Sequence, residues 1–179
     1  MGLPTIYQFF RHQVQYGFDR QGLAEPATVD YLSDMLARFA HTRALYAIRD
    51  QDGKPLERIA ELVAVLHGTS QFEPRAWDRH RRAFIARHIG EYTLFMSGWF
   101  RERLRARGEL DYYLLNGRSA FWQCAHYEPN PRHQRVFRGL HRNFDHIADT
   151  LDNMVRFQLP FTPANVNAQT LIASLWRVY

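Results

Sequence analysis

This chain has one cysteine, one lysine and no long apolar run, and these scarcities exclude several classes of protein. Cys124 alone cannot form an intramolecular disulfide, and a single free thiol fits a reducing cytoplasm. No apolar segment approaches the roughly 20 residues that a membrane-spanning helix needs. The N-terminus lacks the basic-then-apolar pattern of a signal peptide. We therefore expect a cytoplasmic protein with no membrane partner.

Arginine supplies nearly all of the positive charge. Lys54 is the only lysine among 23 basic residues, and the formal net charge is +5. Nucleic-acid-binding proteins usually carry both basic residues along a stripe or loop, so DNA and RNA are the least favoured partners. The planar guanidinium group suits carboxylates and phosphates, and these ligands stay open.

Catalytic and cofactor signatures are also missing. The chain contains no Gly-x-Ser-x-Gly motif, no Walker-type loop and no Gly-x-Gly-x-x-Gly motif. Cys124 and His126 are two residues apart, so on a helix they face different ways and cannot form a nucleophilic dyad. We expect no cofactor.

Nine histidines make a metal site a hypothesis to test against the spacing of possible ligands. Di-iron helical bundles use Glu-x-x-His pairs, and none occurs here. The reverse order occurs twice, from His88 to Glu91 and from His146 to Asp149. The second pair points away from the apolar side of its helix, whereas the first lies on or near the core side. The two pairs therefore do not share an interface, and we expect no metal site.

The residues that are present predict an all-α fold. Hydrophobic residues make up 46% of the 179 residues, enough for one domain with a sizeable core. Apolar residues recur at helical spacing almost throughout, and period-2 alternation is scarce. We predict a single-domain bundle, residues 1–179, of six or seven helices. Five of these helices have predicted ends: Pro4 to just before Gly17, Thr28 to Ala47, Pro55 to Gly68, Arg75 to Arg107, and Leu110 to His126. Two more helices include the segments Phe137–Met154 and Leu171–Tyr179.

Residues 84–100 predict a buried central helix. From Tyr92 to Phe100 there is no charge, and apolar groups fall on every side, so neighbouring helices must cover this segment all round. Glu91 lies at the edge of the apolar stripe. Because burying a lone carboxylate is costly, Glu91 must either pair or take up a proton. We favour pairing with an arginine of a neighbouring helix, and a general acid or base in a pocket is the alternative.

The pocket alternative is the hypothesis of an enzyme or small-molecule-binding protein. His88 and Tyr92 flank Glu91, and together the three supply groups for proton transfer. Tyr113 and Arg118 come from a polar-aromatic stretch in which a glycine permits close approach of a ligand. Ordinary packing of the tyrosines explains this stretch as well. In the same predicted helix Phe121, Trp122 and Ala125 are core candidates.

A heptad spacing marks the helix through Phe137–Met154, with Phe137, Leu140, Phe144, Ile147, Leu151 and Met154 on one face. The opposite face carries charges of both signs at helical spacing, namely Arg138, Arg142, Asp145, Asp149, Asp152 and Arg156. We interpret this face as solvated, with pairs within the helix.

An arginine stripe opens the helix that begins at Arg75. Arg75, Arg79 and Arg82 share one face and form the phosphate or nucleic-acid candidate. Trp77 and Phe84 fall on the opposite face, in line with Glu91, and we interpret them as core residues. A solvated helix start is the simpler interpretation of the stripe.

The last predicted helix is amphipathic and suggests self-association. Leu171, Leu175 and Trp176 form an apolar face that suits the symmetric contact of a homodimer or another homo-oligomer. The sequence therefore favours a non-catalytic helical interaction module. A pocket around Glu91 and anion binding by the arginine stripe are the two alternatives.

Overall fold

The computed structural model describes residues 5–40, 59–68 and 76–159. Those residues form eight α-helices and one π-helical turn, and no strand occurs among them, so the all-α prediction is confirmed. The elements are α1 (Ile6–Asp19), α2 (Pro26–Phe39), α4 (Ile59–Gly68), α5 (Ala76–Trp99), α6 (Arg101–Ala106), α7 (Leu110–Tyr127), α8 (Pro131–Arg142), α9 (Phe144–Asn153) and η1 (Met154–Gln158). None of the described helices is long and apolar enough to cross a bilayer. The predicted segments at 41–47, 55–58 and 171–179 lie outside the described residues.

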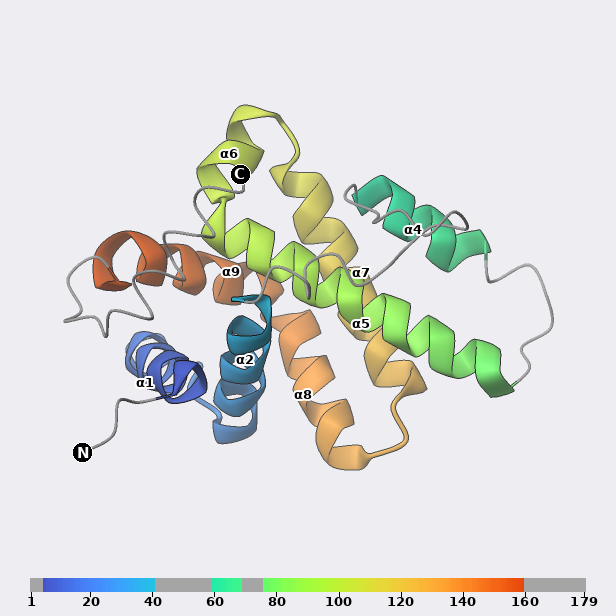
Figure 1. Cartoon of the computed structure of the whole chain (residues 1–179), viewed down its shortest axis with the longest axis horizontal. Coiled ribbons are helices and arrows are strands. Elements are labelled where there is room, and N and C mark those ends of the chain that lie inside the picture. The colour runs from blue at the N-terminus through green and yellow to red at the C-terminus, as the bar shows by residue number, and fades with distance from the viewer. Residues whose placement is uncertain (1–4, 41–58, 69–75, 160–179) are drawn as a thin grey trace.

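Helix α5 runs through the middle of the bundle (Figure 1). It packs against α7, α9 and α4, and every residue from His88 to Phe100 is buried. This confirms the central helix. At its beginning, however, α5 extends toward the edge of the molecule (Figure 1), and Phe84 is 56% exposed. The core prediction for Phe84 is therefore wrong, and the buried part of α5 begins at Ile85, which is 2% exposed.

Capping residues set the beginnings of the first two helices. Thr5 and Gln8 form a reciprocal capping box at α1. For α2 the predicted beginning at Thr28 is wrong. Glu25 is the N-cap, and its carboxylate accepts hydrogen bonds from the Thr28 backbone N–H at 2.9 Å and hydroxyl at 2.8 Å. The helix begins earlier than predicted because Pro26 suits the first helical position.

Two segments predicted as single helices are interrupted. The chain leaves the α-helical conformation at Phe100, which separates α5 from α6, and again at Asn143, which separates α8 from α9. The heptad face stays buried across the second break, where Leu140 and Phe144 are both 0% exposed. This break lets α8 pack on α7 and α2 while α9 packs on α5 and α1.

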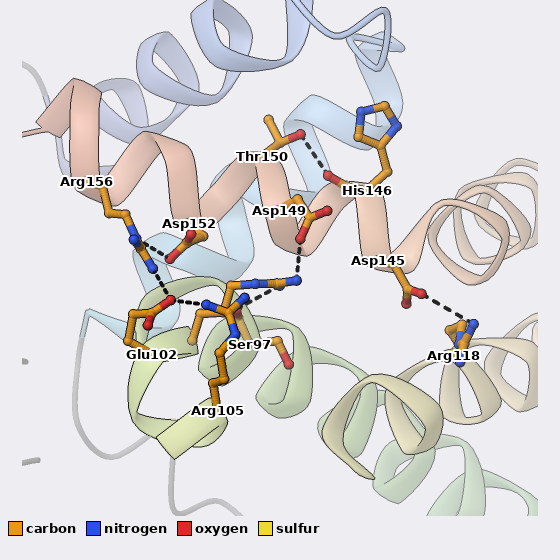
Figure 2. A network of polar contacts seen from close by, with 11 residues as sticks. Ser97, Glu102, Arg105, Arg118, Asp145, His146, Asp149, Thr150, Asp152 and Arg156 are labelled. Atoms are coloured by element: carbon orange, nitrogen blue, oxygen red, sulfur yellow. Dashed lines mark hydrogen bonds and ion pairs between the residues drawn. The ribbon is translucent and has the colours of Figure 1, made fainter. Parts of the chain in front are cut away.

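The charged face of α9 is largely exposed, as predicted, but most of its charges pair with neighbouring helices and not within the helix. Figure 2 shows Asp145 pointing toward Arg118 of α7, with 3.4 Å between carboxylate and guanidinium. Asp149 pairs with Arg101 of α6. Arg156 donates to Asp152 at 2.9 Å, the one pair within the helix, and to Glu102 of α6 at 2.5 Å (Figure 2).

Arg138 and Arg142 of α8 are exposed, as predicted for a solvated face. The pairs of α9 are partly exposed, so each contributes at most about 1 kcal/mol. These ion pairs nevertheless favour the observed position of α9 beside α6 and α7, because opposite charges face one another there.

Glycines allow the closest helix contacts. A Cβ atom on Gly98 of α5 would lie 2.6 Å from Cβ of Leu151. A Cβ atom on Gly117 of α7 would lie 2.1 Å from the Phe144 ring and 2.5 Å from the Thr93 hydroxyl. Gly98 is therefore a close-packing point, and the helix breaks only after it, at Phe100.

We expect Gly117→Ala to lower the free energy of unfolding by about 3 kcal/mol, because the added methyl group displaces the Phe144 ring. Urea denaturation followed by circular dichroism measures this. Gly139→Ala in α8 is the matched control, because its Cβ meets nothing within 4 Å. The control should be neutral or stabilising by up to about 1 kcal/mol. Equal losses in the two variants would contradict the packing explanation.

Candidate functional site

The buried carboxylate of Glu91 is the centre of a polar cluster between α2 and α5. Glu91 is 2% exposed. Its Oε1 accepts hydrogen bonds from the Tyr31 hydroxyl at 2.6 Å, from Arg38 Nη2 at 2.8 Å and from Arg87 Nε at 2.9 Å. Its Oε2 accepts a bond from Arg38 Nη1 at 3.1 Å, so Arg38 binds both oxygens. The structure thus shows the pairing with an arginine of a neighbouring helix that the sequence favoured.

Helical spacing places the four side chains. Tyr31 and Arg38 are two turns apart on one face of α2, and Arg87 and Glu91 are one turn apart on α5. The Arg87 guanidinium also lies 5.4 Å from the centre of the Tyr31 ring, a cation–π contact. Arg38 makes a second ion pair with the exposed Asp34, at 2.8 Å. Each donor is therefore held by a second contact.

Electrostatics keep this cluster charged. Burial alone would raise the pKa of Glu91, but Arg38, Arg87 and the Tyr31 hydroxyl together lower it below its ordinary value. Burial and the nearby Glu91 charge raise the pKa of Tyr31, so the phenol stays protonated and donates. A carboxylate that already accepts four hydrogen bonds has little capacity left to take a proton from a substrate. The arrangement suits holding helices together.

The remaining pocket candidates separate into two places. His88, Tyr92 and Tyr113 form a buried row of rings, with centroids 6.1 Å apart for the first pair and 6.4 Å apart for the second. Burial raises the pKa of Tyr113. Arg118 lies elsewhere, beside Asp145 of α9. The structure therefore does not bring the five predicted pocket residues around one shared space.

A groove lies beside the Glu91 cluster, between the beginning of α5 and the end of α7. It has a volume of about 1000 Å³, and Phe137 of α8 closes one side. Arg79 and Arg82 of the predicted arginine stripe line it, whereas Arg75 lies outside the described residues. Phe84, which the sequence assigned to the core, lines the same groove. Arg79 and Arg82 therefore share a groove with an aromatic ring, although the sequence placed Phe84 on the opposite face.

The outer face of α7 is a second feature that the sequence did not reveal. Trp122 was predicted to be a core residue, but it is 57% exposed, and its ring stacks on His126. Neighbouring residues on a helix point about 100° apart, and Phe121, which is 0% exposed, takes the core position instead. The exposed side also carries Tyr112 and Leu115. Their spacing was a signal in the sequence, but two aromatic residues in a row left the buried side of the helix ambiguous.

Metal ligands do not gather in the described part of the chain, where no group of three or more His, Cys, Asp or Glu side chains lies close enough to hold an ion. His146 Nε2 lies 3.4 Å from the Gln21 side-chain oxygen, and Asp149 is paired with Arg101. Cys124 is 3% exposed, and burial raises the pKa of its thiol. This cysteine therefore packs as a small core residue.

The interface candidates Leu171, Leu175 and Trp176 lie outside the described residues. Comparison with known proteins adds no further assignment. No family model, curated protein or solved structure significantly matches this chain.

We expect Glu91→Gln to lower the free energy of unfolding by about 3 kcal/mol, because it removes the counter-charge of two guanidinium groups in the cluster. Partial exposure of both arginines keeps the loss at the lower end of the range for buried pairs. Asp34→Asn is the control, since it removes an exposed partner of the same Arg38 and should cost less than about 1 kcal/mol. Similar losses in both variants, measured by urea denaturation, would argue against a structural role for Glu91.

The effect of Glu91→Gln should also depend on pH. The folded chain lowers the pKa of Glu91, so the stabilising charge is fully present above the ordinary glutamate pKa of about 4.3. This contribution is lost as the pH falls through the lowered folded value. The difference in unfolding free energy between parent and variant should therefore be largest near neutral pH and shrink below about pH 4. A difference that grows on acidification would contradict the assignment.

Proposed function

We propose that this chain is a non-catalytic helical interaction module that pairs with a second copy of itself through one exposed face of α7. The α7 face consists of Tyr112, Leu115, Ser119, Trp122 and His126, which recur at helical spacing and are all exposed. The three largest side chains, Tyr112, Leu115 and Trp122, are 43%, 60% and 57% exposed. This row of exposed aromatic and aliphatic groups is the observation that carries the proposal.

Charge favours this face over others for self-contact. Two copies that each carry a formal charge of +5 repel one another, so they meet most easily where neither presents an arginine. The α7 face contains no Asp, Glu, Lys or Arg. Arg118, the arginine next to Ser119 in the sequence, lies 3.4 Å from Asp145, which balances its charge. Depletion of charge and enrichment in aromatic residues are typical of the centre of a protein interface.

The order of residues along α7 also suits an antiparallel pair. If a two-fold axis passes near Ser119, Leu115 of one copy faces Trp122 of the other, and Tyr112 faces His126. The first pair joins an aliphatic side chain to an indole ring, and the second joins a phenol ring to an imidazole ring. Ser119 is small, so the two helix axes can approach closely at the crossing point. The contact is self-complementary, as a two-fold interface requires.

The Glu91 cluster supports an interaction role over a catalytic one. Its carboxylate is occupied by Tyr31, Arg38 and Arg87, which fixes α2 on α5. A rigid bundle presents the α7 face without having to order it on binding, which favours affinity. The cytoplasmic location expected from the single cysteine is part of the same proposal.

Leu115→Glu and Trp122→Glu should each weaken self-association. Sedimentation equilibrium at micromolar concentrations should give the parent twice its monomer mass of 21.2 kDa. Each variant should raise the dissociation constant at least about tenfold, because a carboxylate is forced into an apolar contact. Both positions are exposed, so the helical circular dichroism should not change. A parent that stays monomeric at every concentration would overturn the proposal.

Two further variants locate the contact. Phe157→Glu in η1 is the matched control, since Phe157 is 68% exposed but lies on another element, and it should leave the mass unchanged. Trp176→Glu tests the terminal surface that the sequence suggested. If Trp176→Glu alone produced a monomer, the α7 face would not be the interface. Ser119→Cys should give a covalent dimer under oxidation, because the axis brings the two thiols together while Cys124 stays buried.

A further inference from the structure

The groove beside α5 combines a cationic wall with an exposed aromatic ring. Figure 1 shows the beginning of α5, the end of α7 and the beginning of α8 at the same end of the molecule. Arg79, Arg82 and Phe84 line the groove from α5, and His126 and Tyr127 line it from α7. Its volume of about 1000 Å³ is at the upper end of the range of small-ligand sites. A molecule of the size of a nucleotide therefore fits.

Among the described residues, arginines that lack a carboxylate at ion-pair distance occur at this groove and on α8, whose Phe137 lines it. Elsewhere the described arginines of α2 and of the α6–α9 contact face carboxylates, as with Arg38, Arg101 and Arg156. Helix α8, by contrast, carries four arginines and no acidic residue, and Arg132, Arg135 and Arg138 are exposed. No carboxylate within the described residues lies at ion-pair distance from these three or from Arg79.

The acids at the groove do not cancel this charge. Glu128 is the one acidic residue among the described lining residues, and its carboxylate accepts a hydrogen bond from the Asn130 backbone N–H at 2.9 Å. Arg87 also lines the groove, and Glu91 already balances it from behind. Arg79 has no carboxylate at ion-pair distance among the described residues, and its charge makes the groove attractive to an anion.

Phe84 indicates what the rest of the ligand looks like. A phenylalanine that is 56% exposed on a helix start gains nothing from the core, yet it lies in the same groove as the arginines. Arginines that meet phosphates and a ring that stacks on a base are the combination found in sites for single-stranded nucleic acids. A purely carboxylic ligand would use the arginines and leave the ring unused.

We propose that this groove binds a nucleotide unit, with phosphate on Arg79 and Arg82 and the base stacked on Phe84. The unit is either a free nucleotide or part of a single strand, since both present the same phosphate and base. The proposal does not depend on self-association, because the two surfaces share only His126.

Fluorescence anisotropy on the full chain tests this inference. One probe is a labelled oligothymidylate, and a second, used separately, is a labelled ATP analogue. At least one probe should bind, and the affinity should fall steeply as salt rises. Phe84→Ala should weaken binding about tenfold or more through the lost stacking. The double variant Arg79→Gln, Arg82→Gln should weaken binding. Because it removes one to two phosphate contacts, the slope of log binding constant against log salt concentration should become shallower by about one to two.

Matched controls separate the groove from general surface charge and surface aromatics. Arg103→Gln with Arg107→Gln removes two exposed arginines of the α6 region, and Phe157→Ala removes an exposed phenylalanine of η1. Neither should change binding by more than about twofold. The Leu115→Glu variant should bind as the parent does, so failure of the dimer proposal and failure of this one give different results.

The probes also distinguish the sources of the ligand. Binding of the ATP analogue with similar affinity to the oligonucleotide identifies a free nucleotide, and binding of the oligonucleotide alone identifies a single strand. Absence of binding by both probes at low salt would overturn the inference. Displacement by pyrophosphate and by heparin with no effect of Phe84→Ala would also overturn it, because the groove would then be only a basic surface.

Discussion

The rest of this bundle depends on burying one ionised carboxylate. Glu91 lies on the central helix at 2% exposure, and an unpaired charge there would cost several kcal/mol. Arg38 and Tyr31 remove that cost only if α2 lies beside α5 in a single register. Arg87 supplies the local donor, one turn away, but Arg38 comes from 53 residues away in the chain. The carboxylate therefore specifies which face of α2 meets the central helix, a selectivity that apolar contacts alone would not provide.

Close contacts and charge matching fix the other helices. Because Gly98 and Gly117 lack a Cβ atom, side chains of α9 occupy the space on α5 and α7 that a methyl group would otherwise fill. Acids along α9 face arginines of α6 and α7 (Figure 2). In the part of the chain that the structure describes, Arg79 at the groove and the exposed arginines of α8 have no carboxylate at ion-pair distance.

Periodicity predicted much of this architecture, and its errors have a common cause. The helix of residues 110–126, the buried segment 92–100 and the heptad face were all predicted from spacing and are all observed. Phe84 and Trp122 were misassigned to the core, because a helical pattern shows which residues share a face but not how far a neighbouring helix extends along it. Breaks at Phe100 and Asn143 were missed for a similar reason. No proline or turn motif marks them, and packing against α9, α7 and α2 decides them.

The sequence by itself determined the helical class, the buried central segment and the need of Glu91 for a cationic partner, because spacing and the cost of a buried charge act locally. Only the tertiary structure decided that Arg38 meets that need, since the pairing depends on where a distant helix is placed. It also decided which arginines are matched by acids and which face the groove beside Phe84. Charges far apart in the chain become partners or a surplus only when folding sets their distances, and Coulomb energy depends on those distances.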